Sequence, residues 1–204
     1  MGKGLHAVHL NIRSLFPKID QLRAWLSYNN PNIITLSETW LTESITDSSV
    51  HLENYTLYRA DRGSRGGGVV TYISSQLKSQ LIIPKVKPEY FEGIFVKVIL
   101  HANKQLIIGN IYRPPTSPKR ESVKNILATV SSLGDPKEII LLGDFNLNWA
   151  DSSTFTERNL FSGANLTQII KEPTRVGPTS KSLIDWILVS PQQNNEFWCS
   201  FRLF

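Results

Sequence analysis

The chain has 204 residues, of which 41% are hydrophobic, and it carries a formal net charge of +5. This length and composition are those of an ordinary globular protein that forms one domain with a large core. The single cysteine excludes an internal disulfide framework and a cysteine-rich zinc site. The basic balance favours a polyanionic partner such as nucleic acid.

No apolar stretch approaches the roughly 18 residues that are needed to cross a membrane. The first residues, MGKGLHAVHLNIRSL, lack the continuous apolar segment of a secretory signal. We therefore expect a soluble intracellular protein that has no membrane partner.

Short runs rich in β-branched residues predict eight strands. Three of these runs, within residues 32–39, 105–112 and 138–145, are almost continuously apolar, which suits interior strands that are covered on both faces. The eight expected strands span residues 5–12, 32–39, 55–60, 67–73, 92–100, 105–112, 138–145 and 182–189.

Three segments show helical spacing of apolar residues. Residues 16–30 stop before Pro31, residues 118–134 end at a capping glycine, and residues 152–170 form a third, more irregular segment. The order of strands and helices predicts a layered α/β protein in which helices cover sheets of mixed direction.

A glycine-rich segment, RGSRGGGVV, spans residues 62–70. Its glycines lack the spacing of a P-loop or of a dinucleotide-binding fingerprint. We expect a tight turn that leads into a hairpin strand. Contacts of Arg62 and Arg65 with phosphate are the alternative interpretation.

Polar side chains recur at the ends of the expected strands or inside an apolar strand. A rigid sheet that holds polar groups at strand ends is the usual way to build a preorganised site. Oxygen ligands without cysteine or clustered histidine indicate a hard cation, Mg²⁺ or Mn²⁺. The residues concerned are Asn11, Glu38, Asn110, Tyr112, Asp144, Asn146 and Asp185.

Each of these residues also has a purely structural interpretation. Asn11 and Glu38 are suited to capping a helix, and Asp144 is suited to an Asx turn. Tyr112 fits a core position before a proline turn, and a buried Asp185 needs only a hydrogen-bond partner. Their order and context together, rather than any single residue, indicate a site.

Seven stretches, LNIRSL, ITLSETWL, RGGGVVTYI, GNIYRPP, LLGDFNLN, IIKEPTR and SLIDWILVS, follow one another along nearly the whole chain. In this order they resemble the endonuclease/exonuclease/phosphatase superfamily, and within it the apurinic-type endonuclease domain of non-LTR (LINE-type) retrotransposons. The resemblance implies a four-layered α/β sandwich, with two packed sheets of mixed direction and helices outside. It also implies hydrolysis of a DNA phosphodiester that nicks one strand in the nucleus, so that a reverse transcriptase of the same polyprotein can extend the 3′-hydroxyl.

The resemblance further implies a metal site. Asn11 and Glu38 correspond to the pair of residues on the metal side, and the expected cofactor is Mg²⁺ or Mn²⁺. The expected partner is DNA, and the expected oligomeric state is a monomer.

The resemblance assigns roles to four other residues. Tyr112 corresponds to the residue that touches the scissile phosphate, and Asp144 to the group that orients or deprotonates the attacking water. Asn146 corresponds to the donor that helps to hold this water and the phosphate, and Asp185 to the carboxylate that supports the catalytic histidine. Further candidates for contacts with DNA or phosphate are Arg62, Arg65, Asn110 and Arg113.

The match breaks at the terminal Ser-Asp-His motif of the family. No Asp-His pair occurs in the chain, and residues 191–204 form a divergent tail after a domain of residues 1–190. His9 lies two residues before Asn11 and on the same strand face, but this alternation does not identify it as the missing histidine. We expect the fold to lack its last strand unless the tail replaces it, and we expect impaired nuclease activity.

Two alternatives to the nuclease stay open. A phosphatase of inositol lipids or sphingomyelin belongs to the same superfamily, although SETWL and NIYRPP favour the retrotransposon branch. A catalytically silent remnant that binds nucleic acid or protein is supported by the missing Asp-His pair. The retained Asn11, Glu38, Asp144 and Asn146 argue against this second alternative.

Overall fold

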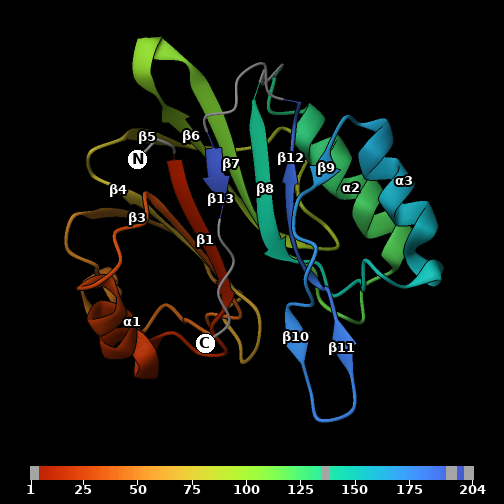
Figure 1. Cartoon of the computed structure of the whole chain (residues 1–204). Helices are drawn as coiled ribbons and strands as arrows, with labels where there is room; N and C mark the ends of the chain where they lie inside the picture. Colours follow the sequence, from red (N-terminus) through yellow and green to blue (C-terminus); the bar gives the residue numbers. More distant parts are fainter. Residues whose placement is uncertain (1–4, 135–137, 192–196, 200–204) are drawn as a thin grey trace.

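A computed structural model of the chain describes residues 5–134, 138–191 and 197–199. Two β-sheets pack face to face, with α1 on the outer face of one sheet and α2 and α3 on the outer face of the other (Figure 1). The predicted four-layered α/β sandwich is therefore confirmed. Within the described ranges, every helix is too short or too polar to cross a bilayer. The α-helices are α1 (Ile19–Leu26), α2 (Lys119–Ser131) and α3 (Phe155–Gly163), and the 3₁₀ helices are Phe16–Lys18, Asp47–Val50, His101–Asn103 and Ser152–Thr154.

The first sheet has the strand order β13-β1-β2-β4-β3. Strand β1 runs parallel to both β2 and β13, and the other pairs are antiparallel. A part of the divergent tail therefore supplies an edge strand beside β1, whereas residues 192–196 and 200–204 lie outside the described residues. The strands are β1 (Leu5–Asn11), β2 (Ile33–Ser37), β3 (Tyr55–Ala60), β4 (Val69–Ser74) and β13 (Phe197–Cys199).

The second sheet has the strand order β5-β6-β7-β8-β12-β9, in which only β7 and β8 are parallel. A small hairpin of β10 and β11 projects beyond the sheets (Figure 1). The strands are β5 (Lys78–Ile82), β6 (Glu92–Ile99), β7 (Gln105–Tyr112), β8 (Ile139–Asp144), β9 (Thr167–Gln168), β10 (Arg175–Val176), β11 (Lys181–Ser182) and β12 (Asp185–Val189).

The third helix is shorter than predicted. It ends at Gly163 rather than near residue 170, because Asn165 takes a left-handed backbone conformation with φ of 57°. Thr167 and Gln168 then pair with β12 as strand β9. The helical spacing after Gly163 was therefore misleading, since strand pairing decides the structure of that segment.

Strand β8 shows why a continuous apolar run forms an interior strand. Ile139 and Leu141 pack against the helices, whereas Ile140 and Leu142 pack between the two sheets. Both faces of the strand are covered, so both sets of alternating side chains are apolar. The same alternation directs Asp144, at the end of β8, into the space between the sheets.

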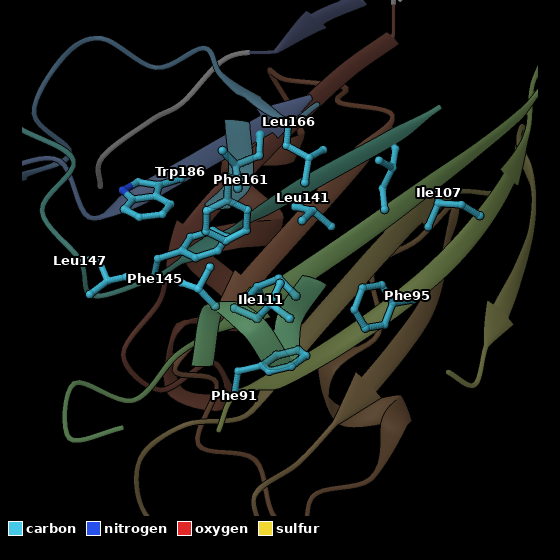
Figure 2. Packing of buried hydrophobic residues seen from close by; sticks show 14 of the residues in the cluster. Phe91, Phe95, Ile107, Ile111, Leu141, Phe145, Leu147, Phe161, Leu166 and Trp186 are labelled. Atoms are coloured by element: carbon cyan, nitrogen blue, oxygen red, sulfur yellow. The ribbon is translucent and has the colours of Figure 1, made fainter. Parts of the chain in front are cut away.

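Aromatic side chains fill the core beneath α2 and α3 (Figure 2). The ring of Trp186 stacks on Phe145, with 4.6 Å between the ring centroids, and meets Phe161 edge to face at 5.9 Å. All three side chains are fully buried. Because Phe145 directly follows Asp144, this cluster also fixes the backbone on which Asp144 lies.

Gly143 of β8 pairs with Ile111 of β7 and leaves no room for a side chain. A Cβ atom at this position would lie 1.9 Å from the backbone oxygen of Ile111. We expect Gly143→Ala to lower the free energy of unfolding by about 2 kcal/mol or more, because backbone atoms cannot yield as side chains do. Urea denaturation measures this loss. Gly163→Ala is the matched control, since its Cβ would meet nothing within 4 Å, and equal stabilities of the two variants would contradict the prediction.

Candidate active site

The polar residues at the strand ends face the space between the sheets. On β1, Ala7 packs in the core between the sheets, and Asn11 points to the same face four residues later. On β7, Tyr112 belongs to that core, and β7 pairs Tyr112 with Asp144 of β8. Strands β1 and β8 end at the same edge of the sandwich, the edge from which the β10–β11 hairpin projects (Figure 1). These side chains therefore converge.

A cleft of about 500 Å³ opens at this edge of the sandwich. The residues for which the resemblance implied metal or catalytic roles all line it, although they come from separate strands and loops. They are Asn11, Glu38, Tyr112, Asp144, Asn146 and Asp185.

Asp144 is held in one orientation by two donors. Its Oδ2 accepts a hydrogen bond from Asn11 Nδ2 at 2.8 Å, and its Oδ1 accepts one from the backbone N–H of Asn146 at 2.9 Å. Burial raises the pKa of Asp144 to about 6, against the effect of these hydrogen bonds, and the charge of Glu38 adds to the increase. A fixed carboxyl with a raised pKa in a cleft is suited to accept a proton.

Asn11, which lines the cleft, keeps one oxygen without a partner among the described residues. An ionised Asp144 only accepts hydrogen bonds, so the amide nitrogen of Asn11 must face it. The other atom of the amide, Oδ1, is buried and has no hydrogen-bond partner among the described residues. A buried acceptor without a donor is costly and calls for a ligand.

Glu38 accepts hydrogen bonds from three sides. The hydroxyl of Tyr112 donates to Oε1, and Oε2 accepts from the indole N–H of Trp40 at 2.5 Å and from the backbone N–H of Gly67 at 2.9 Å. Burial acts to raise the pKa of Glu38, but these hydrogen bonds outweigh it and the pKa lies below its ordinary value. Glu38 is therefore ionised at neutral pH.

The backbone around Glu38 is held in an unusual conformation. Glu38 and Trp40 both have a φ of 55°, in the left-handed region that side chains rarely adopt. The backbone N–H of Ser14 donates to Glu38 O at 2.8 Å, and that of Trp40 donates to Gly67 O at 3.0 Å. Hydrogen bonds from two other loops thus hold this strained segment, as is common at functional sites.

His9 reaches across the two sheets to Asp185. Its Nε2 lies 3.7 Å from Asp185 Oδ1, and neither atom has a hydrogen-bond partner among the described residues. The Thr35 hydroxyl donates to Val8 O at 3.2 Å, so at 2.9 Å it accepts the N–H of His9 Nδ1. The Nε2 atom is then the acceptor of the imidazole.

The charges of this pair follow from its burial. Burial lowers the pKa of His9 to about 3 and raises the pKa of Asp185 to about 7, and the charge of Asp144 adds to the second shift. Both shifts favour the neutral forms, so a protonated Asp185 facing the imidazole is favoured over an ion pair. The contact between His9 and Asp185 was not predictable from sequence patterns, because the two residues lie in different sheets.

The expected contacts of Asn110 and Arg113 with DNA or phosphate require a correction, because neither residue lines the cleft. Asn110 is fully buried, and its Nδ2 donates to Leu36 O at 3.1 Å and to Val70 O at 2.8 Å, which ties the two sheets together. Arg113 is 1% exposed, and its guanidinium donates to backbone oxygens such as Phe145 O. Neither side chain is open to phosphate. Their positions in the polar motifs reflect structural hydrogen bonds.

Arg62 and Arg65 stand beside the aromatic donors to Glu38. The guanidinium carbon of Arg62 lies 5.5 Å from the ring centroid of Tyr112, and that of Arg65 lies 5.6 Å from the ring of Trp40. Both distances allow a cation–π interaction. The glycine-rich segment is therefore packed against the site, and contact of either arginine with phosphate stays a prediction.

Three residues that were not expected at the site bind Glu38 or line the cleft. Trp40 and Gly67 bind Glu38, and Arg175 of the β10–β11 hairpin lines the cleft. The charge of Arg175 acts to lower the pKa values of Asp144 and Asp185, although burial dominates both. The only available signal was proximity in sequence, namely Trp40 two residues after Glu38.

Comparisons with known proteins agree with this architecture. The family described as Endonuclease/Exonuclease/phosphatase family matches residues 8–201. The chain is similar to the 3′ phosphatase NExo from Neisseria bound to a product DNA hairpin, with 18% identity, a TM-score of 0.67, and coverage of 90% of this chain and 85% of that chain. It is also similar to the endonuclease domain of TRAS1, a telomere-specific non-LTR retrotransposon, with 15% identity, a TM-score of 0.68 and coverage of 90% and 84%.

A third similar structure is an AP endonuclease from Archaeoglobus fulgidus, with 13% identity, a TM-score of 0.67 and coverage of 90% of this chain and 85% of that chain. At these identities the likeness concerns the fold. No curated protein sequence matches the chain.

Proposed function

Because the chain belongs to the Endonuclease/Exonuclease/phosphatase family, we propose that its cleft hydrolyses phosphodiester bonds of DNA. The observation that carries the proposal is the meeting of Glu38, Tyr112 and Asp144 with Asn11 in one cleft. DNA is favoured as substrate by the net charge of +5 and by a structural neighbour that is bound to a DNA hairpin.

The donor set of the cleft fits a divalent cation. Asn11 Oδ1 is a buried oxygen without a donor, and the ionised Glu38 lines the same cleft. The described residues contain no cluster of three acidic, histidine or cysteine residues that could form a full protein cage. A site with one carboxylate and one amide oxygen suits Mg²⁺ or Mn²⁺, which keep water and substrate phosphate as further ligands. A cation held by Asn11 and Glu38 would stabilise negative charge on the scissile phosphate.

The residues of the chain supply the other parts of the reaction. Asp144, oriented by Asn11 and Asn146, aligns a water molecule and accepts its proton. The amide of Asn146 is itself fixed, because its Nδ2 donates to Arg113 O at 2.9 Å. Burial raises the pKa of Tyr112, so its hydroxyl stays protonated and donates to Glu38 Oε1 beside the proposed position of the phosphate.

We assign the activity more narrowly to nicking of one DNA strand, in the manner of a LINE-type element that primes reverse transcription. The motifs SETWL and NIYRPP and the similar fold of the TRAS1 endonuclease domain support this assignment. Under this assignment the protein acts on DNA in the nucleus as a monomer and works with a reverse transcriptase.

We further propose that the 204-residue polypeptide turns over slowly. No Asp-His pair occurs in its sequence. His9 contacts Asp185 but is 1% exposed, so it does not offer a donor to the phosphate. The loss of a general acid or base typically reduces a rate by about 10²–10⁴-fold.

Plasmid nicking tests the proposal. We expect the protein to convert supercoiled DNA slowly to open circles with Mg²⁺, and we expect EDTA to abolish the reaction and excess Mg²⁺ to restore it. Nicking that persists in EDTA would contradict the metal-dependent mechanism. Hydrolysis of inositol lipids or sphingomyelin in the absence of any DNA nicking would favour the phosphatase alternative.

A further inference from the structure

The two oxygens of Glu38 have different surroundings. Oε2 accepts two N–H groups, from Trp40 at 2.5 Å and from Gly67 at 2.9 Å, whereas Oε1 accepts, among the residues that the structure describes, only the hydroxyl of Tyr112. A carboxylate oxygen offers two lone pairs for hydrogen bonds or metal ligation. Oε2 is therefore fully used by the protein, and Oε1 retains one lone pair.

We place the free lone pair of Oε1 on the side of the cleft because of the position of its partner. Tyr112, which binds Oε1, lines the cleft together with Glu38. Trp40 and Gly67, which bind Oε2, are not among the described residues that line the cleft. Oε2 is thus occupied by donors from outside the lining of the cleft, whereas Oε1 is the oxygen whose partner lines it.

We propose that Trp40 is a positioning residue of the cation site: with Gly67 it anchors Oε2, so that Glu38 binds a divalent cation through Oε1 alone. This inference rests on the proposed function, because it takes Glu38 as a cation ligand. It adds which oxygen binds and which side chain fixes it.

The indole of Trp40 is itself held in place. The guanidinium of Arg65 covers its ring at 5.6 Å, and its backbone N–H donates to Gly67 O at 3.0 Å. Gly67 in turn has a φ of 69°, and a Cβ at this position would lie 2.3 Å from the guanidinium carbon of Arg62. Both donors to Oε2 are therefore preorganised before any cation arrives.

Trp40→Phe in the full chain tests the inference, because phenylalanine keeps an aromatic ring for Arg65 but lacks the indole N–H that binds Glu38. We expect the Kd for Mn²⁺, measured by isothermal titration calorimetry, to rise roughly 10- to 100-fold, as is typical when a residue that orients a metal ligand is lost. Trp25→Phe also removes one indole, but from α1, and is expected to bind Mn²⁺ as the wild type does.

A second measurement needs no folded Trp40 variant. In ¹H–¹⁵N spectra of the wild type, Mg²⁺ is expected to shift one indole N–H signal, the same signal that Glu38→Gln shifts. The absence of any indole shift in a protein that binds Mg²⁺ would overturn the inference.

The calorimetric outcomes separate this inference from the proposed function. If the wild type and Trp40→Phe bind Mn²⁺ equally well, the role of Trp40 is wrong and the cation site survives. If the wild type binds no Mn²⁺, or Glu38→Gln binds it as tightly as the wild type, both proposals fail.

Discussion

Replacing Asp144 with asparagine is expected to reduce DNA nicking by about 10³-fold, because the amide cannot accept the proton of the attacking water. The shape of the side chain and one of its two hydrogen bonds are kept, so the loss should be chemical rather than structural. Conversion of supercoiled plasmid under single-turnover conditions measures the effect. Asp20→Asn is the matched control, since this exposed carboxyl lies on α1, and it should nick at the wild-type rate.

The same substitution should change how stability depends on pH. Burial raises the pKa of Asp144 to about 6 in the fold, above its ordinary value of 3.8. A raised carboxyl pKa stabilises the fold fully below the ordinary value, and this contribution is lost as the pH rises through about 6. Asp144→Asn should therefore gain stability relative to the wild type between about pH 4 and pH 7, as urea denaturation can show.

If Asp144→Asn nicks DNA at the wild-type rate, Asp144 does not accept the proton of the attacking water.

Glu38→Gln is expected to abolish measurable cation binding and to reduce nicking by about 10³-fold. A bound divalent cation stabilises the charge of the reacting phosphate by several kcal/mol, and each 1.36 kcal/mol corresponds to a tenfold change in rate. The fold should persist, because glutamine can still accept from Trp40 and Gly67 while the Tyr112 hydroxyl turns to accept from its amide.

Calorimetry with Mn²⁺ and the nicking assay together measure this effect. Glu53→Gln, at an exposed carboxyl, is the control and should leave both values unchanged. Unaltered Mn²⁺ affinity in Glu38→Gln would place the cation elsewhere. Loss of affinity with full nicking would separate the cation from catalysis.

The strands were predictable because their side chains alternate between two covered faces. In β8, Ile140 and Leu142 face the other sheet while Ile139 and Leu141 face the helices, which gives the continuous apolar run. The same regularity placed Asp144 at a strand end and on the inner face. Hydrophobic pattern therefore indicated the layers of the fold and the edge at which the site lies.

Whether an individual polar side chain is buried between the sheets or reaches the cleft was not predictable in this way. Asn110 and Tyr112 belong to one motif and one strand face, yet Asn110 is sealed between the sheets and Tyr112 reaches the cleft. The difference of two residues decides whether a side chain lies inside the sandwich or at its edge. Arg113, the next residue, turns inward and binds Phe145 O.

Contacts made by loops, contacts between the sheets and one edge strand could also not be predicted from the sequence. The hydrogen bond from Trp40 to Glu38 joins two residues that both have a left-handed backbone, and no periodic pattern predicts such a conformation. The contact of His9 with Asp185 joins strands of different sheets, so it depends on how the sheets pack. Strand β5 was missed because its exposed edge position gives it a mixed polar and apolar composition.

A crystal structure with Mn²⁺ would locate the cation directly, through the anomalous scattering of the ion. We predict one strong peak in the cleft, within ligand distance of Asn11 Oδ1 and Glu38 Oε1, on the side of Glu38 that faces Asp144. Absence of Mn²⁺ from this cleft, or an ion at a site without Glu38, would show that Asn11 and Glu38 do not form the cation site.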